Sequence, residues 1–178
     1  MRIVSRQIKA QGMSKPIDRF ADTVRRFCRW AESEPQDPVS EARTARRFLA
    51  ELYLQAIDLP EGSPDADATD IAQEQYQSAY KRFGALPFNY YSECFNPLAT
   101  RAEHPVTANL ADDLDDILRD LKRGMALYEN GHAEAAAWEW SFNFNAHWGH
   151  HACGALYALQ TWFSLNNCDF EDNQRRSQ

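Results

Sequence analysis

The chain has 178 residues, the size of one ordinary domain, and 44% of them are hydrophobic, so it can bury a core of its own. Its formal net charge of −7 argues against a nucleic-acid partner, because phosphate backbones attract basic surfaces. The sequence contains no apolar run near the roughly 20 residues that cross a bilayer, and no glycine-rich phosphate loop. These features argue against a membrane partner and against the commonest nucleotide-binding folds.

The cysteines and the first residues indicate a cellular compartment. Cys28, Cys94, Cys153 and Cys168 are widely spaced and form no C-x-x-C pair, so neither a zinc ribbon nor a thioredoxin-type motif is expected. Free thiols are typical of a reducing compartment. Residues 1–13 are basic but lack the apolar stretch of a signal peptide. We therefore expect a cytoplasmic protein in which this segment forms a flexible tail.

Hydrophobic spacing in the first half of the chain predicts helices separated by loops. A first helix is expected over residues 16–34, opened by a proline at its first turn. A second is expected over residues 38–56, with Asp37 as its N-cap. A third covers residues 70–83. The next stretch is rich in aromatic residues and prolines, and we expect a short helix around Tyr91 with irregular flanks.

Two long helices are expected to close the domain. They cover residues 107–130 and 133–164, and Gly131 between them fits a helix C-terminal cap. The predicted fold class is therefore all-α: a single domain over residues 14–165, built as a bundle of about five helices whose two long C-terminal helices run antiparallel. Residues 166–178 are polar and are expected to form a second flexible tail.

Aspartates are concentrated on the penultimate helix, and a helical wheel sorts them by direction. At about 100° per residue, Asp113 and Asp120 fall on the border of the apolar face. Asp112 and Asp116 point away from that face, and we assign them to solvent. Asp115 lies on the opposite flank. Because acidic residues near the start of a helix also suit the positive end of its dipole, the cluster alone establishes no site.

The final helix carries two histidines that can contact the same partner. His147 and His151 lie one turn apart. His151 falls inside an apolar arc that includes Trp140, and His147 lies at its edge. Two imidazoles at this spacing can bind a transition metal, although the glutamate of an H-E-x-x-H motif is missing. Asp113 or Asp120 would supply a third ligand if the last two helices pack antiparallel.

Two interpretations of this cluster stay open. In the first, the histidines belong to a buried hydrogen-bond network that fixes the register of the bundle, and no cofactor is expected. In the second, a divalent transition metal is held by His147, His151 and Asp113. The candidate pocket between the last two helices is lined by Tyr91, Asp113, Asp120, Trp140, His147 and His151.

Several stretches of the chain resemble a known family. They are residues 90–97, 110–124, 138–140 and 147–151, and the His-Trp-Gly-x-His element in the last of these is the most specific. Together they resemble the bacterial domain-of-unknown-function family 5063, from about residue 17 to residue 163. The resemblance implies a compact, all-helical bacterial protein, and it implies no activity.

Two classes of function follow. The lack of a strong catalytic motif favours a non-enzymatic helical module that binds a protein partner, a second copy of the chain included. Such a module requires an exposed apolar patch, for example beside the loop at residues 59–70. The alternative is a metal-dependent or small-molecule enzyme or binding protein around His147 and His151, which requires a cavity beside the two imidazoles.

Overall fold

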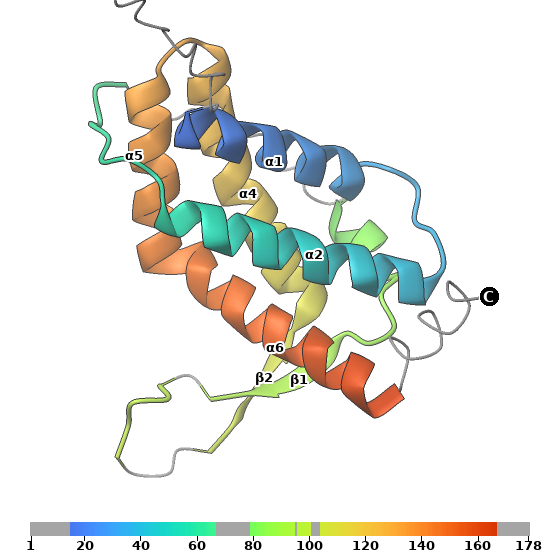
Figure 1. Ribbon diagram of the computed structural model, residues 1–178. Helices are drawn as coiled ribbons and strands as arrows, with labels where there is room; N and C mark the ends of the chain where they lie inside the picture. Colours follow the sequence, from blue (N-terminus) through green and yellow to red (C-terminus); the bar gives the residue numbers. More distant parts are fainter. Residues whose placement is uncertain (1–14, 67–78, 95, 101–103, 167–178) are drawn as a thin grey trace, which may run out of the picture.

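A computed structural model of the chain describes residues 15–66, 79–94, 96–100 and 104–166. The described chain is predominantly helical, as predicted (Figure 1). Its elements are α1 (Pro16–Ala31), α2 (Pro38–Ile57), β1 (Tyr90–Glu93), β2 (Val106–Asn109), α4 (Leu110–Glu129), α5 (Ala133–Asn143), the π-helix η1 (Phe144–Trp148) and α6 (Gly149–Asn166). Of the helix predicted over residues 70–83, the described residues 79–83 are helical. The predicted tails lie outside the described residues, except for Asn166, which ends α6.

The first two helices begin where the sequence predicts. Pro16 and Pro38 stand in the first turns of α1 and α2, where the missing proline N–H is tolerated. Asp37 caps α2, since its Oδ1 accepts hydrogen bonds from the Val39 and Ser40 N–H groups at 3.1 and 3.0 Å. The two helices pack against each other, and α2 also packs along α6 (Figure 1). No helix in the described ranges is long and apolar enough to cross a membrane.

The stretch around Tyr91 is a strand, so the predicted short helix is wrong. β1 pairs with β2 as an antiparallel two-stranded sheet. Aromatic side chains favour strands because they pack well on a pleated surface, and here the partner strand supplies the backbone hydrogen bonds. Side chains alternate along a strand, so Tyr91 and Glu93 point to the same side.

Because of this strand, α4 begins at Leu110 and not at the predicted Thr107. Residues 106–109, which the prediction assigns mostly to the helix, pair with β1 in the sheet instead. The side chain of Asn109 then caps the helix, accepting hydrogen bonds from the N–H groups of Ala111 and Asp112 at 3.0 and 3.3 Å.

Helices α4 and α5 meet at a close contact between Gly124 and Trp140. A Cβ atom at Gly124 would overlap the indole ring. The Trp140 indole N–H donates to the Leu121 carbonyl at 3.0 Å, and the Trp148 indole N–H donates to the Trp140 carbonyl at 3.2 Å. Phe20 of α1 packs edge-on against Trp140, with ring centroids 5.0 Å apart. The core between α1, α4 and α5 thus satisfies both buried indole N–H groups.

The final helix, predicted as one piece over residues 133–164, is interrupted by η1. The Gly149 N–H donates to the carbonyl of Phe144, five residues earlier, which widens one turn of the helix. A Cβ atom at Gly149 would collide with that carbonyl, so the position needs a glycine. The chain changes direction at η1 (Figure 1). His147 lies within η1, and His151 lies in the first turn of α6.

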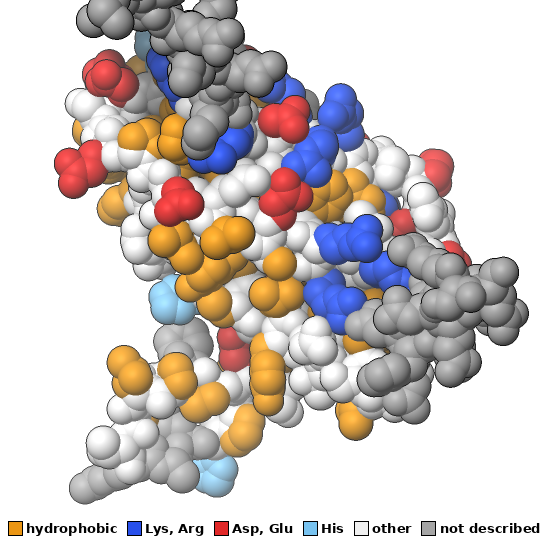
Figure 2. Space-filling model, viewed as in Figure 1, with side chains coloured by type: hydrophobic (Ala, Val, Ile, Leu, Met, Phe, Trp, Pro, Cys, Tyr) orange, Lys and Arg blue, Asp and Glu red, His pale blue; other side chains and the backbone are white. Residues whose placement is uncertain are grey.

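Apolar side chains gather on the surface where the end of α2 meets α5. Leu54 and Ile57 of α2 are 65% and 61% exposed, and Phe142 of α5 is 53% exposed. Figure 2 shows hydrophobic side chains clustered over this part of the molecule. We call these three residues the α2–α5 patch.

Candidate metal centre

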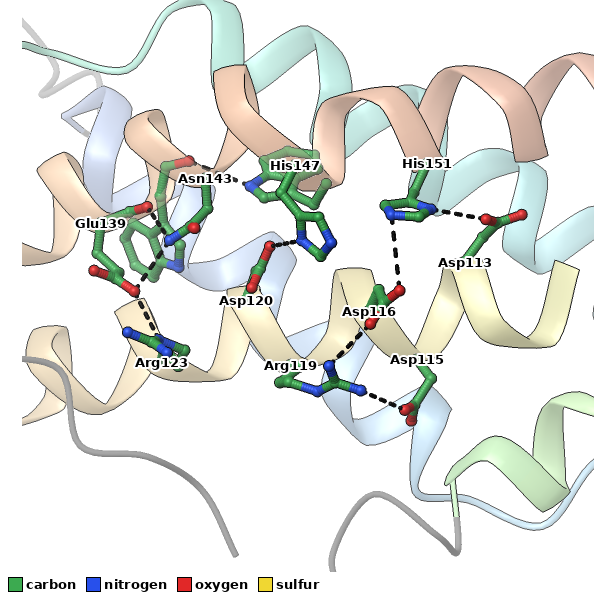
Figure 3. A network of polar contacts seen from close by, with 12 residues as sticks. Asp113, Asp115, Asp116, Arg119, Asp120, Arg123, Glu139, Asn143, His147 and His151 are labelled. Carbon is green, nitrogen blue, oxygen red and sulfur yellow. Dashed lines mark hydrogen bonds and ion pairs between the residues drawn. The ribbon is translucent and has the colours of Figure 1, made fainter. Parts of the chain in front are cut away.

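Helix α4 faces the junction of η1 and α6 across a row of carboxylates and imidazoles (Figure 3). Asp113, Asp116 and Asp120 of α4 are spaced i, i+3 and i+7, which places them on one side of the helix. His147 and His151 face them from the other side, with ring centroids 4.8 Å apart and ring planes inclined by 78°. We call these five residues the histidine–aspartate cluster.

Each imidazole of the cluster is held by one aspartate through Nδ1. His147 Nδ1 lies 2.7 Å from Asp120 Oδ2, and His151 Nδ1 lies 2.8 Å from Asp113 Oδ1. Because an ionised carboxylate can only accept, Nδ1 carries the hydrogen in each pair. On a neutral imidazole the lone pair is then on Nε2, which is the nitrogen that can bind a metal.

Asp116 belongs to the cluster, so its assignment to solvent is wrong. Its side chain is 18% exposed, and its Oδ2 lies 3.7 Å from His151 Nε2. Its other oxygen, Oδ1, lies 3.0 Å from a guanidinium nitrogen of Arg119, which also pairs with Asp115 at 3.2 Å. Arg119 therefore holds Asp116 with one oxygen directed at the imidazoles. Asp112, assigned to solvent with it, is exposed.

Three residues of the cluster offer converging ligand atoms. One such atom from each of Asp116, His147 and His151 lies within 4.8 Å of the other two. Asp113, the predicted third ligand, instead bonds to Nδ1 of His151, and Asp120 bonds to His147 in the same way. Carboxylates in this position orient a metal-binding imidazole and make it a stronger ligand.

Burial and hydrogen bonding shift the pKa values of several groups in this region. The hydrogen bond to Asp113 raises the pKa of His151, although burial of the ring opposes it. Burial raises the pKa of Asp120, and the hydrogen bond with His147 offsets part of that rise. Burial also raises the pKa of Asp115, against the effect of its partner Arg119. These three groups therefore bind protons more firmly than their exposed counterparts.

The other two residues of the predicted pocket differ in their placement. The Tyr91 hydroxyl donates to Asp113 Oδ2 at 2.8 Å, which ties the hairpin to the cluster. Burial of that hydroxyl and the nearby Asp113 carboxylate both raise the pKa of Tyr91. Trp140 is fully buried in the core, and its N–H is bonded to the Leu121 carbonyl. It does not line the cavity beside the cluster.

A cavity of about 340 Å³ opens beside the two imidazoles. Its lining residues are Glu93, Ala146, His147, His150 and His151. Sequence reasoning misses Glu93 because it treats the region as helical, whereas in a strand the residue two positions after Tyr91 shares its side. For Asp116, the spacing shared with Asp113 and Asp120 is the signal that identifies it.

The chain belongs to the family described as "Domain of unknown function (DUF5063)", whose model matches residues 11–164. This confirms the resemblance found in the sequence. Among solved structures, the crystal structure of protein BF1032 from Bacteroides fragilis is similar, with a TM-score of 0.65 and 21% sequence identity. The match covers 84% of this chain and 95% of that chain, and at this identity it supports the fold alone. No curated protein matches the chain.

Proposed function

We propose that the protein binds a divalent transition metal ion through Asp116, His147 and His151. One observation carries the proposal: each of these side chains is held by a partner on the atom that faces away from the centre. Asp120 holds His147, Asp113 holds His151, and Arg119 holds Asp116. A metal site needs its ligands oriented in advance, and partners of this kind provide the orientation.

The spacing of the ligand atoms fits a metal after small movements. Metal–nitrogen and metal–oxygen bonds of about 2.0–2.2 Å place neighbouring tetrahedral ligands roughly 3.4 Å apart. The 3.7 Å separation between Asp116 Oδ2 and His151 Nε2 is already close to that value. All three ligand atoms lie within 4.8 Å of one another, and small side-chain rotations would bring them to bonding distance of one ion. Two imidazoles and one carboxylate suit zinc, iron, cobalt or nickel better than magnesium or calcium.

The alternative, a network that only fixes the helices, accounts for the structure less well. Nδ1 of both rings is bonded, but the same pairing leaves Nε2 of both rings directed away from their aspartates. The His147 side chain is 43% exposed, and the cavity lies beside it. A purely structural polar network is expected to be buried and satisfied at every atom, since each unmade bond is costly there.

Elemental analysis of untagged protein tests the proposal. We expect near-stoichiometric metal, either as purified or after exposure to zinc, iron and manganese followed by gel filtration. The His151→Ala and Asp116→Asn variants should lose it, and circular dichroism should show that they are folded. His132→Ala, which removes an exposed histidine that lies directly before α5 and outside the cluster, is the matched control and should retain the metal. A wild-type protein that ignores all three metals would make His147 and His151 structural.

A second candidate function is binding of a protein partner through the α2–α5 patch. Leu54, Ile57 and Phe142 are exposed, and Phe142 lines a surface hollow together with Glu61 and Gly62 of the loop where the sequence predicts such a surface. Sedimentation of the wild type and of a Leu54→Gln, Ile57→Gln variant tests whether the partner is a second copy. A concentration-dependent dimer that the variant loses would support this role, and two identical monomers would argue against self-association.

We also propose that the protein works in the cytoplasm. Cys28, Cys94 and Cys153 are free thiols, which supports a reducing compartment. Thiol titration of protein purified without reductant tests this: reactive thiols support it, and a disulfide-linked product would contradict it.

A further inference from the structure

The cavity beside the candidate metal centre has room for a small molecule. Its volume of about 340 Å³ lies at the lower end of the range for small-molecule sites. Three protein ligands leave at least one coordination position open in a metal site, as catalytic centres do and closed structural centres do not. Because His147 and His151 line the cavity, a small molecule in it would lie next to an ion held by these two imidazoles.

Glu93 enters this cavity from the hairpin. It reaches α6 over Gly154, where a Cβ atom would lie 2.5 Å from Glu93 Oε1 and 2.6 Å from the Tyr91 hydroxyl. The absence of a side chain at Gly154 therefore lets both groups lie against α6, one turn beyond His151. The strand alternation that directs Tyr91 to Asp113 directs Glu93 to the cavity.

Carboxylates dominate the charge around the cavity. Glu93 lines it, and Asp113, Asp116 and Asp120 lie against the two imidazoles that line it. Arg119 pairs with Asp115 as well as with Asp116. A divalent ion would offset only part of this negative charge. The surroundings therefore disfavour phosphate and other anionic ligands, because like charges in a partly buried site repel strongly.

On the basis of the metal site proposed above, we propose that the protein hydrolyses an uncharged ester or amide bound in this cavity. Glu93 accepts the proton from the attacking water while the water oxygen bonds to the acyl carbon. An ion held by Asp116, His147 and His151 would polarise that water. The bond from that carbon to the leaving oxygen or nitrogen then breaks, and the proton passes from Glu93 to the leaving group. Water and substrate give an acid and an alcohol or amine, and no electrons are transferred.

The placement of Glu93 suits that role, because its side chain lines the same cavity as the imidazoles of His147 and His151. A general base must lie within reach of the water that attacks the substrate.

Cobalt-loaded protein tests this proposal with para-nitrophenyl acetate and para-nitrophenyl phosphate as probes. The wild type should hydrolyse the acetate, and metal-free protein should not. Glu93→Gln should take up the same amount of cobalt and react about a hundredfold more slowly, the size of a lost general base. Glu34→Gln removes an exposed glutamate before α2 and should match the wild type. Inorganic phosphate should leave the visible spectrum of the cobalt protein unchanged.

The outcomes separate this proposal from the metal site. A chain that takes up no cobalt contradicts the metal site itself. A chain that takes up cobalt but hydrolyses neither probe, or hydrolyses the acetate equally well with Glu93→Gln, contradicts the hydrolytic role and leaves the metal site standing. Faster cleavage of the phosphate probe, or a spectrum that phosphate changes, would overturn the assignment to uncharged substrates.

Discussion

The contacts between α4 and the last helices divide into a closed half and an open half. In the closed half, toward α5, Arg123 donates to Glu139 at 2.8 Å and the Asn143 side chain donates to the same carboxylate at 3.0 Å. In the open half, toward α6, His147 and His151 stand opposite aspartates (Figure 3). In both halves, carboxylates pair with nitrogen donors across the contact between α4 and the last helices.

The difference lies in what the nitrogen groups retain after pairing. A guanidinium is always protonated and offers only donors, so the pair of Arg123 and Glu139 can only hold the helices together. A neutral imidazole that donates through Nδ1 keeps a lone pair on Nε2. The closed half also borders the packed contact between Gly124 and Trp140, whereas the open half borders a cavity. The same type of contact can therefore stabilise a fold in one place and prepare a binding site in another.

The largest expected effect comes from the closed half. Trp140→Ala should lower the free energy of unfolding by about 3–5 kcal/mol, because it empties a fully buried site and removes the indole hydrogen bond to the Leu121 carbonyl. Urea denaturation measures the change. Trp138→Ala removes a partly exposed indole from the same helix and should cost clearly less. Equal losses in the two variants would contradict a core role for Trp140.

In the open half, Asp120→Asn should weaken metal binding by about 10- to 100-fold, since the amide is a poorer acceptor for His147 Nδ1. Isothermal titration with zinc measures the affinity. Asp112→Asn is the matched control, because it removes an exposed aspartate from the first turn of the same helix. If both variants bind zinc as tightly as the wild type, Asp120 has no role in orienting His147.

Metal binding should weaken as the pH falls. The metal competes with a proton for Nε2 of His151, whose pKa is raised above its ordinary 6.5 chiefly by Asp113. Affinity should therefore fall about tenfold per pH unit for each proton displaced, starting above the ordinary histidine pKa. In Asp113→Asn this fall should begin at a lower pH. An affinity that stays constant through this range would exclude His151 as a ligand.

The smallest expected effect concerns the link between the hairpin and the cluster. Tyr91→Phe removes the hydrogen bond to Asp113 and should lower the free energy of unfolding by about 1 kcal/mol. Tyr90→Phe is the control, because that neighbouring side chain is 69% exposed. Thermal or urea unfolding distinguishes them. Two variants with the same midpoint would show that the hairpin is not held through Tyr91.

Local signals in the sequence predict the helices well. The starts of α1 and α2 follow from Pro16, Pro38 and the Asp37 cap, which act within a few residues of the chain. The hairpin depends instead on pairing between residues 90–93 and 106–109, which no local pattern encodes. The interruption at η1 likewise depends on how Phe144 and Gly149 pack in the folded chain.

The sequence likewise predicts only part of the candidate site, because it shows spacing within one helix but not the contacts between helices. The wheel of α4 places Asp113 and Asp120 toward the final helix, and the spacing of His147 and His151 predicts that they act together. The wheel assigns Asp116 to solvent because it represents one helix alone, without the imidazoles opposite or the Arg119 that holds the carboxylate. Packing between the helices decides which aspartate orients an imidazole and which one can bind a metal. A wheel of one helix does not contain that information.

Anomalous diffraction from crystals soaked in cobalt tests the central claim most directly, because it locates the ion rather than counting it. We predict one strong peak within bonding distance of Asp116 Oδ2 and of Nε2 of His147 and His151, with both Nδ1 atoms still bonded to their aspartates. A cluster without a peak, with cobalt elsewhere in the crystal or nowhere, would contradict the claim and leave these imidazoles as structural links between the last helices.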